Sequence, residues 1–209
     1  MVLEGQHVRL EPLAERHLAD LLPLVQGPRE TFAVTWVPRD EAGLRQYLEV
    51  ALEEQRLGVS LPFATVDRRR GKAVGSTRFM TIDFWAARPG SALARPPGVP
   101  HAVEIGHTWL GPQAQRTALN TEAKLLMLGH AFQRWEVLRV TLKTDARNVR
   151  SRTAIERLGC KLDGVVRAHS PSADGGPRDV ALYSMLAGEW PEVRVRLDAR
   201  LARGGRPAT

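Results

Sequence analysis

The sequence has almost no cysteine: Cys160 is the only one among 209 residues. A single cysteine excludes an intrachain disulfide scaffold and a zinc site built from several thiolates. The six histidines show neither the HExxH pattern nor another ligand spacing, so we expect no metal. Cys160 opens a strand-like run, where a thiol is more often a small core residue than a nucleophile.

Long apolar runs are also absent. No run approaches the roughly 18 residues that a membrane span needs, and the first five residues lack the basic and apolar regions of a signal peptide. We therefore expect no membrane association and a cytoplasmic protein. Hydrophobic residues make up 43% of the chain, enough for a core, and the length suits one domain.

Acidic residues are fewer than basic ones, which gives a net charge of +7. Such a balance suits nucleic acid, or a small anionic ligand such as a CoA nucleotide. The arginines are scattered, however, and form a block only at residues 68–70, between two strand-like runs. We interpret this block as a solvated hairpin tip, so nucleic acid is not the partner that the sequence favours.

Hydrophobic periodicity predicts a chain in which helices and strands are interspersed. The expected helices cover residues 18–25, 41–57, 120–135 and 149–158. The expected strands cover residues 5–10, 61–66, 73–84, 102–110, 138–143, 161–168 and 178–186. Asp40 and Asn148 are suitable N-caps, and Gly159 suits a left-handed helix stop. This order predicts a mixed α/β sheet with helices on both faces.

Two segments lack a strong pattern. Residues 86–100 are rich in Pro, Gly and Ala and predict an exposed loop. After Trp190 comes one amphipathic stretch, followed by residues 204–207, which we expect to be frayed. We therefore place a single domain over residues 1–190, with a C-terminal helix and tail over residues 191–209.

A strand, a loop and a helix start follow one another from Glu104 to Asn120. The first N–H groups of a helix have no intrahelical partner, and the helix dipole adds about half a positive charge there. We expect a pyrophosphate to bind the amides from about Gln115 to Thr121, with Arg116 as a counter-charge. Taken alone the pattern is not specific, because many α/β proteins contain such a turn.

Four stretches match one protein family in the same order. They are Glu104-Ile105-Gly106 with Trp109-Leu110; Gln115-Arg116-Thr117-Ala118-Leu119-Asn120 with Glu122-Ala123; Thr144–Arg152 leading to Leu158-Gly159; and Arg178-Asp179-Val180 with Tyr183-Ser184 and Glu189-Trp190. With these stretches the sequence resembles the GCN5-related N-acetyltransferase (GNAT) superfamily, whose acetyl-CoA loop reads Gln/Arg-x-x-Gly-x-Gly/Ala. It is most similar to the RimJ/RimL-like branch, which acetylates the N-terminal amines of ribosomal proteins.

This resemblance implies a fold and a cosubstrate. The fold is α/β (α+β): one GNAT-like domain whose mixed, mostly antiparallel sheet of about seven strands is flanked by helices, with a splayed central strand pair. The cosubstrate is acetyl-CoA. By resemblance, the residues that bind it are His107, Trp109, Leu110, Gln115, Arg116, Thr117, Ala118, Leu119, Asn120, Thr121, Asn148, Ser151 and Arg152.

The loop departs from the family pattern in three places. The key glycine falls on Ala118, the last small residue falls on Asn120, and Arg116 stands where relatives often have glycine. Glycine permits a positive φ and close approach of a phosphate. If φ were positive at Ala118, its methyl group would cost about 1 kcal/mol or more.

The resemblance also suggests catalytic groups, each with a structural alternative. Glu104 is the first candidate for the general base, or forms an ion pair at a strand start. Ser151 or Tyr183 would protonate the CoA thiolate, although Ser151 and Asn148 also suit a helix start and Tyr183 suits sheet packing. Strand alternation predicts that His107 faces away from Glu104. Arg152 would pair with the nucleotide 3′-phosphate or remain solvated.

The expected function is acetyl transfer from acetyl-CoA to a primary amine, either a protein N-terminus or a small molecule. The alternative is a catalytically degenerate relative that binds CoA, or nothing, and serves as a regulatory or scaffold module. The acceptor pocket would come from the loops at residues 27–39, 86–100 and 170–176. The loop at 86–100 would shape that pocket or form a homodimer contact.

Overall fold

The computed structural model describes residues 1–204, and the last part of the predicted frayed tail lies outside them. The strands are β1 (Leu3–Glu4), β2 (Val8–Pro12), β3 (Ser60–Asp67), β4 (Lys72–Asp83), β5 (Ala102–Leu110), β6 (Arg139–Asp145), β7 (Lys161–Pro171) and β8 (Pro177–Leu186). The helices are α1 (Leu18–Val25), α2 (Glu41–Arg56), α3 (Ala118–Gln133), α4 (Val149–Leu158) and α5 (Trp190–Gly204).

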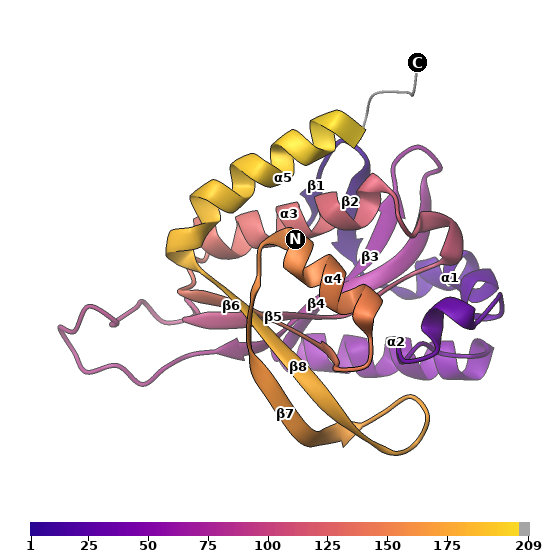
Figure 1. Cartoon of the computed structure of the whole chain (residues 1–209), viewed down its shortest axis with the longest axis horizontal. Helices are drawn as coiled ribbons and strands as arrows, with labels where there is room; N and C mark the ends of the chain where they lie inside the picture. Colours follow the sequence, from indigo (N-terminus) through magenta and orange to yellow (C-terminus); the bar gives the residue numbers. More distant parts are fainter. Residues whose placement is uncertain (205–209) are drawn as a thin grey trace.

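All eight strands form one sheet in the order β1-β2-β3-β4-β5-β6-β8-β7. Helices α1 and α2 cover one face, and α3, α4 and α5 cover the other (Figure 1). Each face has its own buried cluster, because alternate side chains of a strand point to opposite faces. Phe63 belongs to the α3 side, for example, and the next residue, Ala64, to the α2 side.

Strands β5 and β6 form the parallel pair in a sheet whose other printed pairings are antiparallel. Their pairing begins at Ala102 with Arg139 and ends at Glu104 with Thr141. Beyond these residues β5 continues to Leu110 and β6 to Asp145 without being paired to each other. The mixed sheet with a splayed central pair, expected from the resemblance, is confirmed.

Local signals in the sequence are confirmed at three helix ends. The Asp40 side chain accepts a hydrogen bond from the Gly43 N–H at 2.8 Å, and the Asn148 side chain accepts one from Ser151 N–H at 3.0 Å. Gly159 ends α4 in the left-handed region, with φ of 99°. The arginine block forms an exposed turn between β3 and β4, as predicted.

Two boundaries were wrong. The strand predicted at residues 5–10 begins later, as β2 at Val8, and an additional short strand, β1 at Leu3–Glu4, precedes it and pairs with it as a hairpin. Helix α3 begins at Ala118 rather than at Asn120, because the Thr117 side chain provides the N-cap and accepts a hydrogen bond from Leu119 N–H.

Helix α3 ties the N-terminal hairpin to the body of the protein. The buried Glu122 carboxylate accepts hydrogen bonds from the backbone N–H groups of Gln6, His7 and Val8 at 2.6–2.7 Å. A Cβ atom at Gly5 would collide with the carboxylate of Glu122, so a side chain there would displace Glu122 from these hydrogen bonds. The helix in turn supports α5, whose Trp190 stacks on Phe132 at 5.7 Å.

Candidate functional site

A bulge in β5 reverses the direction of its side chains. His107 has φ of 47°, and the register of β5 against β4 shifts at this point. Ile105 is buried on the α3 side, but Trp109, an even number of residues later, is buried on the α2 side. His107 therefore lies on the same face as Glu104, next to Tyr47 of α2 with ring centroids 6.5 Å apart. The prediction that the two side chains face opposite ways was wrong, because it assumed regular alternation.

A buried lysine holds this bulge from the α3 side. Lys124 Nζ donates to Thr108 Oγ1 at 2.6 Å and to Thr77 Oγ1 at 2.9 Å, and the two hydroxyls are 2.8 Å apart. The Lys124 residue is 3% exposed. Desolvation lowers the pKa of Lys124 from 10.5 to about 7, because its neighbours are neutral hydroxyls rather than carboxylates. The bulge is thus fixed by three polar groups inside the core.

The start of α3 offers free backbone donors. Its first N–H groups precede the regular helix bonds, and within residues 1–204 only Leu119 N–H finds a side-chain acceptor there. The preceding turn has its left-handed residue at Arg116, with φ of 60°, whereas Ala118 is helical. The Ala118 methyl group therefore causes no backbone strain, and the position that favours glycine is Arg116.

Gln115 braces the loop that leads to these donors. Its Nε2 donates to the Leu110 carbonyl at 2.8 Å and to Thr31 Oγ1 at 3.0 Å, and its Oε1 accepts from Arg150 at 2.7 Å. This side chain therefore links the end of β5 to the segment before α2 and to α4. Among the residues predicted to bind the pyrophosphate, Gln115 holds the loop in place through its side chain. Residues Arg116 to Thr121 form the turn before α3 and the first turn of that helix.

The start of α4 lies beside the end of β6. Asn148 caps the helix, and its Nδ2 donates to Thr35 Oγ1 at 3.3 Å. For the Ser151 hydroxyl no hydrogen bond is found within residues 1–204. Capping by Asn148 confirms the structural alternative for that residue without excluding a contact with a ligand.

Tyr183 and Arg152 are engaged with each other. The Tyr183 hydroxyl donates to Glu156 at 2.8 Å and accepts from Arg152 Nε at 3.0 Å, and Tyr183 is 0% exposed. Arg152 Nη1 also donates to the Ala146 carbonyl. Desolvation is the main reason why the pKa of Tyr183 is raised. The Tyr183 hydroxyl therefore already has both a donor and an acceptor within the protein.

Glu104 is the last residue of β5 that pairs with β6. Its Oε2 is 2.8 Å from Lys143 Nζ and accepts a hydrogen bond from Thr81 Oγ1 at 3.3 Å. The ion pair considered for this residue is thus present. It lies in a cavity of about 180 Å³ on the sheet face opposite α3, which Arg139 and Asp163 also line. The carboxylate is buried, yet it borders open space.

The surroundings of His107 keep its imidazole neutral. Although the residue is exposed, protein atoms approach the ring closely, and desolvation followed by the charge of Arg78 lowers the pKa of His107 to about 4. Arg78 is 1% exposed, donates to Glu54 at 2.6 Å and lies 5.0 Å from the Tyr47 ring centroid. His107 is therefore unprotonated near neutral pH.

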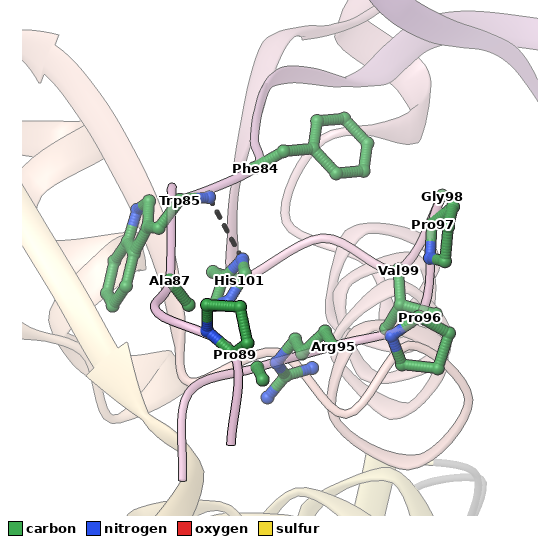
Figure 2. A pocket seen from close by; sticks show the side chains of 11 residues that line it. Phe84, Trp85, Ala87, Pro89, Arg95, Pro96, Pro97, Gly98, Val99 and His101 are labelled. Atoms are coloured by element: carbon green, nitrogen blue, oxygen red, sulfur yellow. Dashed lines mark hydrogen bonds between the residues drawn. The ribbon is translucent and has the colours of Figure 1, made fainter. Parts of the chain in front are cut away.

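The predicted loop after β4 carries a second, larger cavity. Prolines and aromatic side chains surround about 500 Å³ of space, with Phe84 and Trp85 exposed (Figure 2). Trp85 stacks on His101 with centroids 5.2 Å apart, and Trp85 N–H donates to His101 Nδ1. Because β5 starts here, the loop lies at the Glu104 end of β5, away from the start of α3.

The single cysteine lies in the core. Cys160 is 5% exposed, and desolvation raises the pKa of its thiol to about 12, so it is a core residue. No helix within residues 1–204 is long and apolar enough to cross a membrane. In the same residues, no group of three or more His, Cys, Asp or Glu side chains is placed to hold a metal ion.

The sequence reasoning missed Lys124 and Lys143. Lys143 occupies a polar position of an alternating strand, a pattern that predicts solvent exposure rather than contact with Glu104. Lys124 did carry a signal. It interrupts the apolar face of a predicted helix between Ala123 and Leu125, and a lysine in such a position is buried only when it has polar partners.

Residues 7–161 match the family model described as an acetyltransferase (GNAT) domain. A T. thermophilus protein described as an acetyltransferase is 34% identical over 96% of each chain, with a TM-score of 0.77. A GCN5-related N-acetyltransferase from Brucella melitensis is 28% identical over 100% of this chain and 91% of its own, with a TM-score of 0.83.

A more distant similarity concerns fold alone. Mycobacterium smegmatis RimJ, solved in complex with CoA-disulfide, is 21% identical over 92% of this chain and 88% of its own, with a TM-score of 0.73. The comparison with curated proteins gave no match.

Proposed function

We propose, since the chain belongs to the GNAT acetyltransferase family, that this acyltransferase moves the acetyl group of acetyl-CoA to a primary amine by direct attack in a ternary complex. The observation that carries the proposal is the divergence of β5 and β6. It leaves unpaired backbone edges between the free N–H groups of α3 and the carboxylate of Glu104.

The start of α3 would bind the diphosphate of acetyl-CoA. Its unpaired N–H groups and the positive end of the helix dipole favour an anion. Arg116, held in the turn before the helix, adds a full positive charge. Asn148 at the start of α4 and the β5 backbone from His107 to Leu110 would bind the pantetheine arm with the hydrogen bonds that a neighbouring strand would otherwise take.

Glu104 would accept the proton of the incoming amine, because it is the carboxylate where the two strands diverge. A backbone N–H in the β5 bulge would polarise the thioester carbonyl. We assign the proton for the departing thiolate to Ser151 rather than to Tyr183. The Tyr183 hydroxyl already donates to Glu156 beneath α4, whereas the Ser151 hydroxyl keeps its proton available.

The acceptor would be a protein N-terminus, as in the RimJ/RimL-like branch, or a small-molecule amine. A degenerate CoA-binding module was the alternative, and its motive was a methyl group at a position expected to need glycine. Ala118 is helical, so its methyl group causes no backbone strain, and contact of the methyl group with the pyrophosphate is left as the reason for this alternative.

Calorimetry with acetyl-CoA tests donor binding, and consumption of acetyl-CoA in the presence of N-terminal peptides and small amines tests transfer. We expect saturable binding and at least one amine that accelerates release of free CoA. If binding were undetectable at millimolar acetyl-CoA, the proposed acetyl transfer would be contradicted. Binding without turnover on any amine would instead favour the module.

A further inference from the structure

The cavity beside Glu104 is lined by charged side chains of both signs. Asp83, Glu104 and Asp163 contribute carboxylates, and Arg139 and Lys143 contribute cations. These residues come from β4, β5, β6 and β7. The cavity therefore lies beside the point where β5 and β6 diverge. Its volume of about 180 Å³ exceeds the share of one water molecule several times, which is room for a small alkyl group.

One oxygen of Glu104 is occupied and the other is not. Oε2 binds both Lys143 Nζ and Thr81 Oγ1. For Oε1 no hydrogen-bond partner is found within the described part of the chain. This oxygen lies beside Gly106, where an added Cβ would be 3.3 Å from Oε1 and 2.5 Å from the sulfur of Met80, so the Met80 side chain packs over the glycine.

Lys143 is itself a primary alkyl ammonium that reaches the base from the cavity side. Its side chain is 28% exposed and that of Glu104 is 8% exposed. An ion pair that is open to water on one side is held weakly, because solvent screens it. A second ammonium entering the cavity can therefore replace Lys143 at low cost.

We propose that this cavity is the amine-acceptor subsite and that Lys143 is a displaceable counter-ion standing where the acceptor's ammonium binds. The inference rests on the proposed acetyl transfer. It makes the acceptor a protonated primary alkyl amine and disfavours acceptors with an anionic group next to the amine. The three carboxylates of the cavity attract a cation, and once Lys143 swings into solvent they outnumber the remaining cation.

The reaction then balances as follows. The bound ammonium gives one proton to Glu104, and the neutral nitrogen forms a bond to the thioester carbon. The carbon–sulfur bond breaks, the sulfur takes a proton, and the nitrogen loses its second proton. The products are an N-alkyl acetamide, CoA thiol and one proton released to water. Lys143 returns to Glu104 when the uncharged amide leaves.

The test compares Lys143→Met with Lys143→Arg and with Lys161→Met. Lys161, the first residue of β7, forms an ion pair with Glu189 outside the cavity. The Lys161→Met substitution therefore removes the same charge from a lysine–glutamate pair that does not line the cavity. The probes are n-butylammonium and butyrate, which have similar size and opposite charge. Their binding is measured by NMR titration, and acetyl-CoA binding is measured by calorimetry on the same proteins.

Removing the counter-ion should strengthen binding of n-butylammonium to Lys143→Met by about two- to fivefold, the range for a partly screened ion pair. Lys143→Arg and Lys161→Met should resemble the wild type, and butyrate should not bind. The inference would be overturned if n-butylammonium bound equally to Lys143→Met and to the wild type, or if it bound to neither. It would also be overturned if butyrate bound as tightly as n-butylammonium. If acetyl-CoA still binds in that case, the proposed function stands without it.

Discussion

Near β5, each face of the sheet carries one buried glutamate and one lysine, of which Lys124 is buried and Lys143 is partly exposed, and the two pairs differ. On the α3 side, Glu122 takes three backbone N–H groups and Lys124 takes two hydroxyls, and neither forms an ion pair within residues 1–204. On the α2 side, Glu104 and Lys143 pair with each other beside a cavity. Burial of a charged group is therefore not a sign of catalysis. A carboxylate whose hydrogen bonds are all satisfied holds structure, whereas one with an open oxygen can exchange partners.

The largest expected effect is on the α2 side. Glu104→Gln keeps the shape of the side chain but removes the proton acceptor, and we expect kcat/KM to fall by about 10²- to 10⁴-fold. Affinity for acetyl-CoA and the free energy of unfolding should change little, because glutamine can still accept the Thr81 hydrogen bond. Steady-state kinetics measure kcat/KM, and urea denaturation measures the free energy of unfolding. A loss of activity below tenfold would contradict the role of this carboxylate.

The matching change on the α3 side should act on stability. Glu122→Ala leaves the N–H groups of Gln6, His7 and Val8 without their acceptor, and we expect a loss of about 3 kcal/mol or more in the free energy of unfolding. Glu122→Gln should lose less, because it retains one carbonyl oxygen. Urea denaturation measures the loss. Activity per folded molecule should stay within a few-fold, and a collapse of kcat in folded protein would break the comparison.

The buried Lys124 should make the free energy of unfolding depend on pH. In the unfolded chain a lysine keeps its proton up to about 10.5, whereas in the folded protein the pKa of Lys124 is about 7. Between these values the unfolded state binds one proton more, so raising the pH favours the folded state by about 1.4 kcal/mol per pH unit.

The comparison is with Lys124→Met, which lacks this proton. The free energies of unfolding are measured at pH 7.5, 8.5 and 9.5. The value for the wild type minus the value for the variant should increase as the pH rises. Parallel curves would mean that Lys124 keeps its charge in the folded protein, and the contrast with the ion-paired Lys143 would be lost.

The smallest effects concern the turn that joins β5 to α3. Arg116→Gly removes the cost of a positive φ but adds freedom to the unfolded chain, and we expect a net gain on the order of 0.5 kcal/mol. Ala118→Gly, at a helical residue, should lose about 0.5–1 kcal/mol. Thermal denaturation should therefore shift the two midpoints in opposite directions. Equal shifts would show that the left-handed residue lies elsewhere.

Much of the fold could be predicted from local patterns. The arginine turn, the caps Asp40 and Asn148 and the stop at Gly159 depend on residues next to one another in the chain, and all were found where expected. The start of α3 was missed by two residues, since Thr117 competes with Asn120 as an N-cap and only the folded turn selects between them.

The candidate site was less predictable. Glu104 could be selected from its strand and its resemblance to a family, but its partner Lys143 is 39 positions away and lies on another strand. The hydroxyl of Tyr183 was a reasonable proton donor until its contacts with Arg152 and Glu156 were known. No local pattern contains such pairings, because they arise when separate segments pack.

The sequence by itself determined the elements, their order and the family, because hydrophobic period, capping residues and short motifs act within a few residues of one another. Only the tertiary structure decided that His107 shares a face with Glu104 and that Arg116 rather than Ala118 takes the left-handed conformation. It also decided that the buried Lys124 meets two hydroxyls, whereas the partly exposed Lys143 meets a carboxylate. The physical reason is that a bulge and a buried polar contact are set by the register between strands and by the helices packed on them, which join residues far apart in the chain.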